Sequence, residues 1–200
     1  MNEVLPDILG WSRLSPPHGY DFNGYLVRDS AGNLCIDPVQ PDEASLDQLA
    51  RLGVAKILLT NRNHSRAANQ VRERTGAQVL MHPDDAEHAR GQGTTIDAPL
   101  VPGERIGPLV VIGAPGKSPG EVALHWPSRR ILFVGDVVIG NPPGRCSVLR
   151  EQVMDDPARL RRSVIELAKL DFDTLLVGDG TPILGEAKAR LLELVQTFGP

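Results

Sequence analysis

The sequence has few of the features that mark secreted, membrane or nucleic-acid-binding proteins. It contains only two cysteines, Cys35 and Cys146, and they form no closely spaced pair. This cysteine usage indicates reduced thiols and a cytoplasmic location rather than a disulfide framework. The N-terminus carries acids and no basic segment, so we expect no secretory signal. No apolar run approaches the ~18–20 residues that a membrane-spanning helix needs. The net charge of −4 gives no electrostatic reason to expect nucleic acid or an anionic membrane as a partner.

The length and composition fit one globular domain. Hydrophobic residues make up 41% and charged residues 23% of the chain, close to the globular average, which argues against disorder. Two hundred residues are enough to bury a sizeable core. No low-complexity tract or long linker separates the halves. We therefore predict a single domain over residues 1–200.

The residue pattern predicts alternating strands and helices in two similar halves. The first half contains a predicted hairpin at 23–29 and 34–37, strands at 56–60 and 78–81, and helices over 41–52, 67–75 and from 83 onward. The second half contains predicted strands at 109–112, 122–126, 131–134 and 172–177, and helices from 157 onward and over 186–197. We predict an α/β fold, most simply a sandwich of two sheets flanked by helices.

Four loops at the carboxyl ends of predicted strands attract attention, because function in α/β sheets gathers there. They follow Asp37 and Thr60, include Asp136, and form the turn 178–180. Six segments carry a family resemblance: NGYLV at 23–27, LCIDP at 34–38, ILLT at 57–60, GKSPG at 116–120, LFVGD at 132–136 and GDG at 178–180. In order and spacing they resemble the metallo-β-lactamase superfamily, the fold of glyoxalase II, over roughly residues 20–185. The resemblance implies an αβ/βα four-layer sandwich of two mixed β-sheets flanked by helices.

The resemblance also implies where metal ligands would lie. The family uses a His-x-His-x-Asp-His loop, a His in a Gly-His-x-Pro-Gly loop, the Asp of a Gly-Asp pair and a final His between glycines. The seven ligand slots are occupied here, in that order, by Asn61, Asn63, Ser65, Arg66, Lys117, Asp136 and Asp179. Only Asp136 keeps its ligand type. Zinc prefers imidazole and carboxylate ligands, so the motif is degenerate.

Two of the replacements carry a positive charge. Arg66 and Lys117 enter where metal ligands would point, while Asp136 and Asp179 remain as anions. We therefore predict that ion pairs fill the space of the metals, because buried aspartates need compensating donors. No cofactor is expected. If a divalent metal binds, the predicted ligands are His64, which falls at a spacer position of the motif, with Asp136 and Asp179.

Three functions remain open from the sequence. The first is a catalytically inactive or repurposed domain that binds a small, anionic ligand or a protein partner. The second is a hydrolase of esters or thioesters that holds one metal ion through an atypical ligand set. The third is a metal-free enzyme that uses Lys117 or an aspartate as acid or base. We favour the first and leave open whether the chain is an enzyme, because one fold hosts many chemistries.

The other histidines have simpler interpretations. His82 precedes a proline and two acids and is predicted to start a helix. His125 lies on a predicted strand, and His18 lies in a Pro-Pro-His-Gly loop that is a candidate for the border of the pocket.

Overall fold

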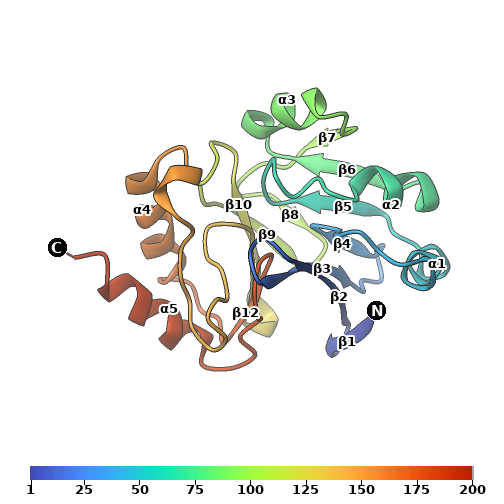
Figure 1. Cartoon of the computed structure of the whole chain (residues 1–200). Coiled ribbons are helices and arrows are strands. Elements are labelled where there is room, and N and C mark those ends of the chain that lie inside the picture. Colours follow the sequence, from blue (N-terminus) through green and yellow to red (C-terminus); the bar gives the residue numbers. More distant parts are fainter. Residues whose placement is uncertain (200) are drawn as a thin grey trace.

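Two β-sheets stacked face to face form the centre of the molecule, and helices cover the outer face of each (Figure 1). The computed structural model describes residues 1–199. The first sheet contains, in spatial order, β1 (Asn2–Leu5), β2 (Ile8–Ser15), β3 (Tyr20–Val27), β4 (Leu34–Ile36), β5 (Lys56–Leu59), β6 (Gln78–Met81) and β7 (Ala98–Pro99). The second contains β12 (Thr174–Val177), β11 (Ile131–Val134), β10 (Val122–Trp126), β9 (Leu109–Gly113) and β8 (Arg105–Ile106).

Both sheets are mixed. In the first, β1 to β4 pair antiparallel and β4 to β7 pair parallel. In the second, β11 and β12 are parallel and the other pairs are antiparallel. This architecture confirms the predicted sandwich of two mixed sheets flanked by helices.

Helices α1 (Glu43–Leu52), α2 (Ala68–Thr75) and α3 (Pro83–Gly91) lie on the first sheet, and α4 (Pro157–Leu167) and α5 (Ala187–Gln196) on the second. The apolar stripe of α1 packs Leu46 and Leu49 on the first sheet. That of α4 packs Leu160 and Val164 on the second. A third apolar cluster, which includes Phe133, fills the space between the sheets. The chain thus buries three apolar layers in one four-layer domain.

Every strand and helix predicted from the sequence is present. The pattern did not reveal β1, β2 and the short strands β7 and β8, nor the 3-10 turns η1 (Pro127–Arg129) and η2 (Glu151–Val153). His82 caps α3 as predicted, its ring accepting a hydrogen bond from the Asp84 amide at 3.2 Å. Cys35 is a buried core residue, and both cysteines are free thiols. Within residues 1–199, no helix is long and apolar enough to cross a bilayer.

The sheets meet where the parallel strands of each end. Asp37 follows β4, Thr60 follows β5, Asp136 lies just after β11, and the 178–180 turn follows β12. The side chain of Asn23 on β3 ties the two halves together, because it donates to the carbonyl oxygens of Val177 and Gly180 at 3.0 and 2.8 Å. Loops from both sheets therefore converge on one edge of the sandwich.

Candidate functional site

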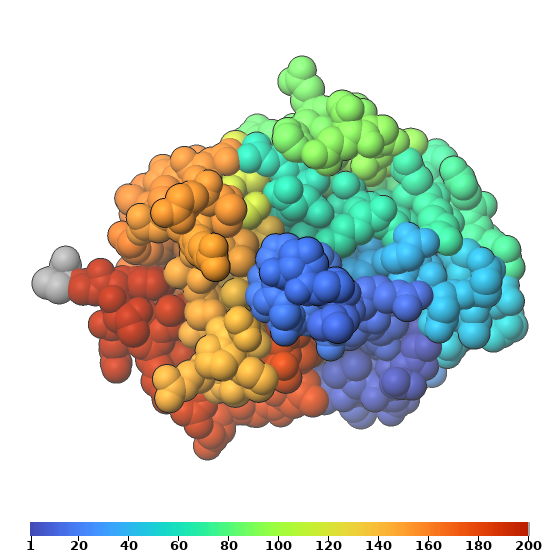
Figure 2. All heavy atoms as spheres, viewed as in Figure 1, coloured from blue at the N-terminus to red at the C-terminus, as the bar shows by residue number. Residues whose placement is uncertain are grey.

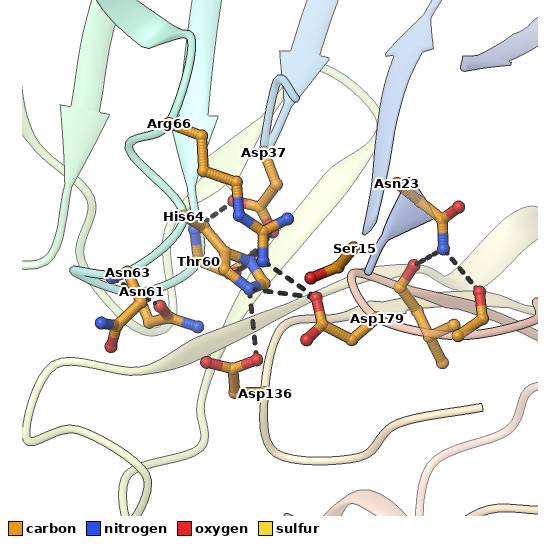
Figure 3. A network of polar contacts seen from close by, with 12 residues as sticks. Ser15, Asn23, Asp37, Thr60, Asn61, Asn63, His64, Arg66, Asp136 and Asp179 are labelled. Carbon is orange, nitrogen blue, oxygen red and sulfur yellow. Dashed lines mark hydrogen bonds and ion pairs between the residues drawn. The ribbon is translucent and has the colours of Figure 1, made fainter. Parts of the chain in front are cut away.

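His64 lies at the centre of a buried polar network at this edge (Figure 3). Its Nδ1 is 2.8 Å from Asp37 Oδ2, and its Nε2 is 3.2 Å from Asp136 Oδ1 and 3.8 Å from Asp179 Oδ1. The ring is fully buried. His64 therefore joins the first sheet, through Asp37, to two aspartates of the second half of the chain.

The contacts of His64 define its protonation state. Carboxylates accept hydrogen bonds and do not donate them when ionised, so both ring nitrogens must carry hydrogen to bond Asp37 and Asp136. Burial and the nearby Arg66 charge lower the pKa of His64, but Asp37 and Asp136 outweigh them and raise it to about 10. His64 is thus an imidazolium at neutral pH.

Two further cations hold the aspartates. Arg66 Nη2 donates to Asp179 Oδ1 at 2.9 Å, and its guanidinium lies over the Phe22 ring at 4.0 Å from the centroid. Lys117 Nζ lies 3.3 Å from Asp136 Oδ2 and donates to Asn63 Oδ1 at 2.9 Å. Both cation–carboxylate pairs predicted from the sequence are formed.

The charges around Asp136 and Asp179 shift their pKa values in opposite directions. Burial opposes ionisation of Asp136, yet His64, Lys117 and Arg66 hold its pKa well below its usual range. Burial and the Asp136 charge raise the pKa of Asp179 despite the opposing cations His64 and Arg66.

A buried carboxyl, Glu121, lies behind the network. Glu121 Oε1 accepts from the Asp136 amide at 2.6 Å and from Asn61 Nδ2 at 3.2 Å, while Oε2 is buried without a hydrogen-bond partner among residues 1–199. Burial and the Asp136 charge raise the pKa of Glu121 well above its usual range. The other three acids of the network, Asp37, Asp136 and Asp179, contact the basic side chains of His64, Arg66 and Lys117.

Local backbone features explain why His64 turns inward. A Cβ at Gly178 would lie 2.4 Å from His64 Cε1, so only glycine leaves room for the ring there. On the other side, Asp37 accepts from the Thr60 amide at 2.8 Å and from Thr60 Oγ1 at 2.6 Å, which orients the carboxylate toward His64. Gly178 in the second half of the chain and the hydrogen-bonded Asp37 in the first half thus position the ring.

The two loops that carry the network are joined by Asp85 of α3. Its carboxylate accepts from the Arg62 amide at 2.9 Å in the first loop. It also accepts from Ser118 Oγ at 2.5 Å and the Gly120 amide at 3.0 Å in the second. The side chain is fully buried, so Asp85 fixes the spacing between the Arg66 loop and the Lys117 loop.

A pocket of about 700 Å³ opens beside the network. Its lining includes the charged residues Arg66, Lys117, Asp136 and Asp179, together with residues of the β2–β3 turn and of segment 139–153. In the space-filling view the blue β2–β3 turn stands beside the amber segment of residues 140–150 (Figure 2). A cavity of this size is typical of small-molecule sites, and His18 is part of its border as the sequence suggested.

Seven of the eight predicted site residues join the network, and one does not. Asn61, Asn63, His64, Arg66, Lys117, Asp136 and Asp179 are brought together by the contacts described above. Ser65 lies in the same loop, but among residues 1–199 its side chain makes no hydrogen bond and does not line the pocket.

The network also contains residues that sequence reasoning did not select. The sequence marks Asp37 and Thr60 only as strand ends and Asp85 only as part of a helix start, and it does not single out Glu121. A signal was available for the first pair, because a buried acid and a threonine end two adjacent parallel strands, β4 and β5. No local signal distinguishes Asp85, since two acids in the first turn are typical of any helix start.

Three residues could hold a metal ion. His64, Asp136 and Asp179 each offer one ligand atom, and these atoms lie within 4.8 Å of one another. This is the ligand set that the sequence named for a metal if one binds, so the expectation that the chain has no cofactor is not supported by the geometry.

The donor chemistry does not fit a two-metal centre. Both carboxylates are already paired with side-chain cations, and His64 Nε2 would have to lose its proton before it could bind a metal. In addition, Arg66 Nη1 is buried without a partner among residues 1–199, and this group can only be satisfied by an acceptor, not by a cation. A single ion would have to displace these ion pairs.

Comparisons with known proteins agree with the fold. A sequence profile of the metallo-beta-lactamase superfamily matches residues 2–198. The hydroxyacylglutathione hydrolase of Fuscovulum blasticum is 29% identical over 172 residues, which are 82% of this chain and 64% of that protein. The chain spans less than two thirds of the length of the curated relatives it matches.

Solved structures extend the similarity to three dimensions. The protein TTHA1623, solved in a di-iron-bound form, is 30% identical, with 88% of this chain and 96% of that chain covered and a TM-score of 0.68. The metallo-beta-lactamase FIM-1 from Pseudomonas aeruginosa, in the mono-zinc form, shares the fold at 16% identity, with 98% and 94% covered and a TM-score of 0.77. Because the profile spans nearly the whole described sandwich, the chain belongs to the metallo-beta-lactamase superfamily.

Proposed function

We propose that this chain is a metallo-beta-lactamase-fold domain in which side-chain cations take the place of the metal ions. In this proposal the domain does not catalyse hydrolysis and binds a small anionic ligand in the pocket beside the network. The observation that carries the proposal is the buried position of the His64 ring, whose two nitrogens lie 2.8 Å from Asp37 Oδ2 and 3.2 Å from Asp136 Oδ1.

The ion pairs support the same function. Lys117 and Arg66 neutralise the carboxylates that relatives with this fold could offer to metals. A metal ion entering this space would meet two fixed positive charges, which repel it. The same charges attract an anion, and Lys117 and Arg66 both line the pocket.

Metal analysis of untagged protein, purified without chelators, tests the proposal. We expect far less than one zinc, iron or manganese ion per chain, and no change in melting temperature when zinc sulfate is added. About one metal ion per chain, whose removal abolishes hydrolysis of a hydroxyacylglutathione thioester, would overturn the proposal. A chelator-treated sample to which zinc is returned serves as the control.

The second candidate is a hydrolase with a single metal ion. The spacing of His64, Asp136 and Asp179 favours it. Two relatives favour it as well, a hydroxyacylglutathione hydrolase and a protein solved in a di-iron-bound form. The same measurement separates the two functions, because only the second requires a stoichiometric metal.

A further inference from the structure

We infer that the pocket selects ligands with one carboxylate and an apolar body. Lys117 and Arg150 bind the carboxylate, and the apolar side chains of Ile139, Val148, Leu149 and Val153 contact the body. The inference rests on the proposed function, because it places Lys117, and not a metal ion, opposite the carboxylate.

The charges that line the pocket fit a monoanion. Its charged lining consists of the cations Arg66, Lys117 and Arg150 and the carboxylates of Asp136 and Asp179, with His18 counted as neutral. Three cations against two anions leave one positive charge. A ligand with two negative charges would therefore carry one unbalanced charge close to Asp136 and Asp179, which is unfavourable at low dielectric.

Two of these cations have donors to spare. The Lys117 ammonium has three N–H donors, and it gives one to Asn63 Oδ1 and directs another to Asp136 Oδ2. One donor is left for a ligand oxygen. The guanidinium of Arg150 is exposed and, within the described chain, makes no side-chain hydrogen bond or salt bridge, although it lines the pocket. The two side chains can thus bind the two oxygens of one carboxylate.

Apolar side chains also line the pocket. They are those of Ile139, Val148, Leu149 and Val153, and Val153 is 52% exposed. The Phe22 ring lines the pocket as well, and the Arg66 guanidinium lies over it. An apolar ligand body packed here would remove the exposed Val153 surface from water, which stabilises the complex.

A panel of five probes tests the selectivity by isothermal titration calorimetry. The probes are hexanoate, acetate, hexanol, adipate and hexyl phosphate. We expect hexanoate to bind most tightly, at least about tenfold more tightly than acetate, because the longer chain buries several more methylene groups. The inference is wrong if hexanol, adipate or hexyl phosphate binds as tightly as hexanoate.

Two rim substitutions test the residues. Arg150→Gln should weaken hexanoate binding about fivefold, as expected for one partly exposed charge, while Arg145→Gln, an exposed arginine outside the pocket, should not. Val153→Asn should weaken hexanoate about threefold and leave acetate unchanged. Val101→Asn, at a half-exposed valine away from the pocket, is its control. Equal effects of a substitution and its control would overturn the role assigned to that residue.

Measuring metal content on the same preparations keeps the two proposals separate. Metal-free protein without selectivity for hexanoate contradicts this inference alone. A stoichiometric metal ion contradicts the proposed function, and with it the arrangement on which this inference rests.

Discussion

At the level of single residues, the position of His64 decides the chemistry of the site. His64 occupies a spacer position of the motif, yet it is the central cation of the network. Its ring turns inward because Gly178 leaves room for it and Asp37 accepts the hydrogen on Nδ1. The sequence named His64 as the substitute ligand but could not place it. Which side chain of a short loop turns inward depends on Gly178, which lies more than a hundred residues away in the sequence.

The charge of His64 predicts a stability that depends on pH. Its pKa is about 10 in the folded protein and 6.5 in the unfolded chain. A group whose pKa is raised in the folded state contributes its full stabilisation at pH values below the unfolded-state pKa. This contribution is lost as the pH rises toward the folded-state pKa. We therefore expect the free energy of unfolding to fall by on the order of a few kcal/mol between pH 6.5 and pH 10, measured by urea denaturation.

His64→Gln supplies the comparison for this prediction. The variant should show a smaller decline over the same pH range, whereas His82→Gln, which changes a helix cap outside the network, should keep the decline of the parent. NMR of the parent should find both His64 ring nitrogens protonated at pH 7.5. A single protonated nitrogen at that pH would contradict the assignment.

At the level of secondary-structure elements, regular patterns were predictable and edge elements were not. Strand β11 is apolar throughout, strand β5 is apolar after Lys56, and helices α1 and α4 have clear caps and apolar stripes. Strand β2 has an irregular burial pattern, exposed over its later residues, so no alternation marks it. The ion pairs followed from charge in the motif slots, but Glu121 and Asp85 act through tertiary contacts that have no local pattern.

Asp85 makes a prediction at this scale, because it connects α3 to both site loops. Asp85→Asn replaces an oxygen that accepts hydrogen bonds with an amide nitrogen that must donate, so at least one buried partner loses its acceptor. We expect a loss of about 2–3 kcal/mol in the free energy of unfolding. Hydrogen exchange should become faster at the amides of Arg62 and Gly120.

The neighbouring Asp84→Asn is the matched control, since the Asp84 side chain is 61% exposed. It should change the free energy of unfolding by less than about 0.5 kcal/mol. If the two substitutions lower the free energy of unfolding by the same amount, Asp85 does not join the loops.

At the scale of the whole molecule, the two halves still bring the motif loops to one edge. Asn63 of the first loop and Lys117 of the second touch at 2.9 Å, and Lys117 lies 3.3 Å from Asp136, which follows β11 of the second sheet. The loops that carry the motif positions are therefore brought together, and the chain departs from the motif in its side chains. An experiment can therefore test the arrangement of the loops separately from the identity of their side chains.

The double substitution Asn63→His with Lys117→His tests the arrangement of the loops in this way. It removes the Lys117 cation and places two imidazoles beside Asp136, which gives the three protein ligands typical of an open zinc site. We expect about one zinc per chain by metal analysis and a melting temperature that rises with added zinc.

The control, Asn63→Gln with Lys117→Arg, keeps the positions polar and cationic and should bind none. If the parent binds zinc as tightly as the double variant, Lys117 does not exclude the metal. If neither binds, the loops have lost their alignment as well as their ligands, because only a shared geometry at the sheet edge lets two exchanged side chains restore a metal site.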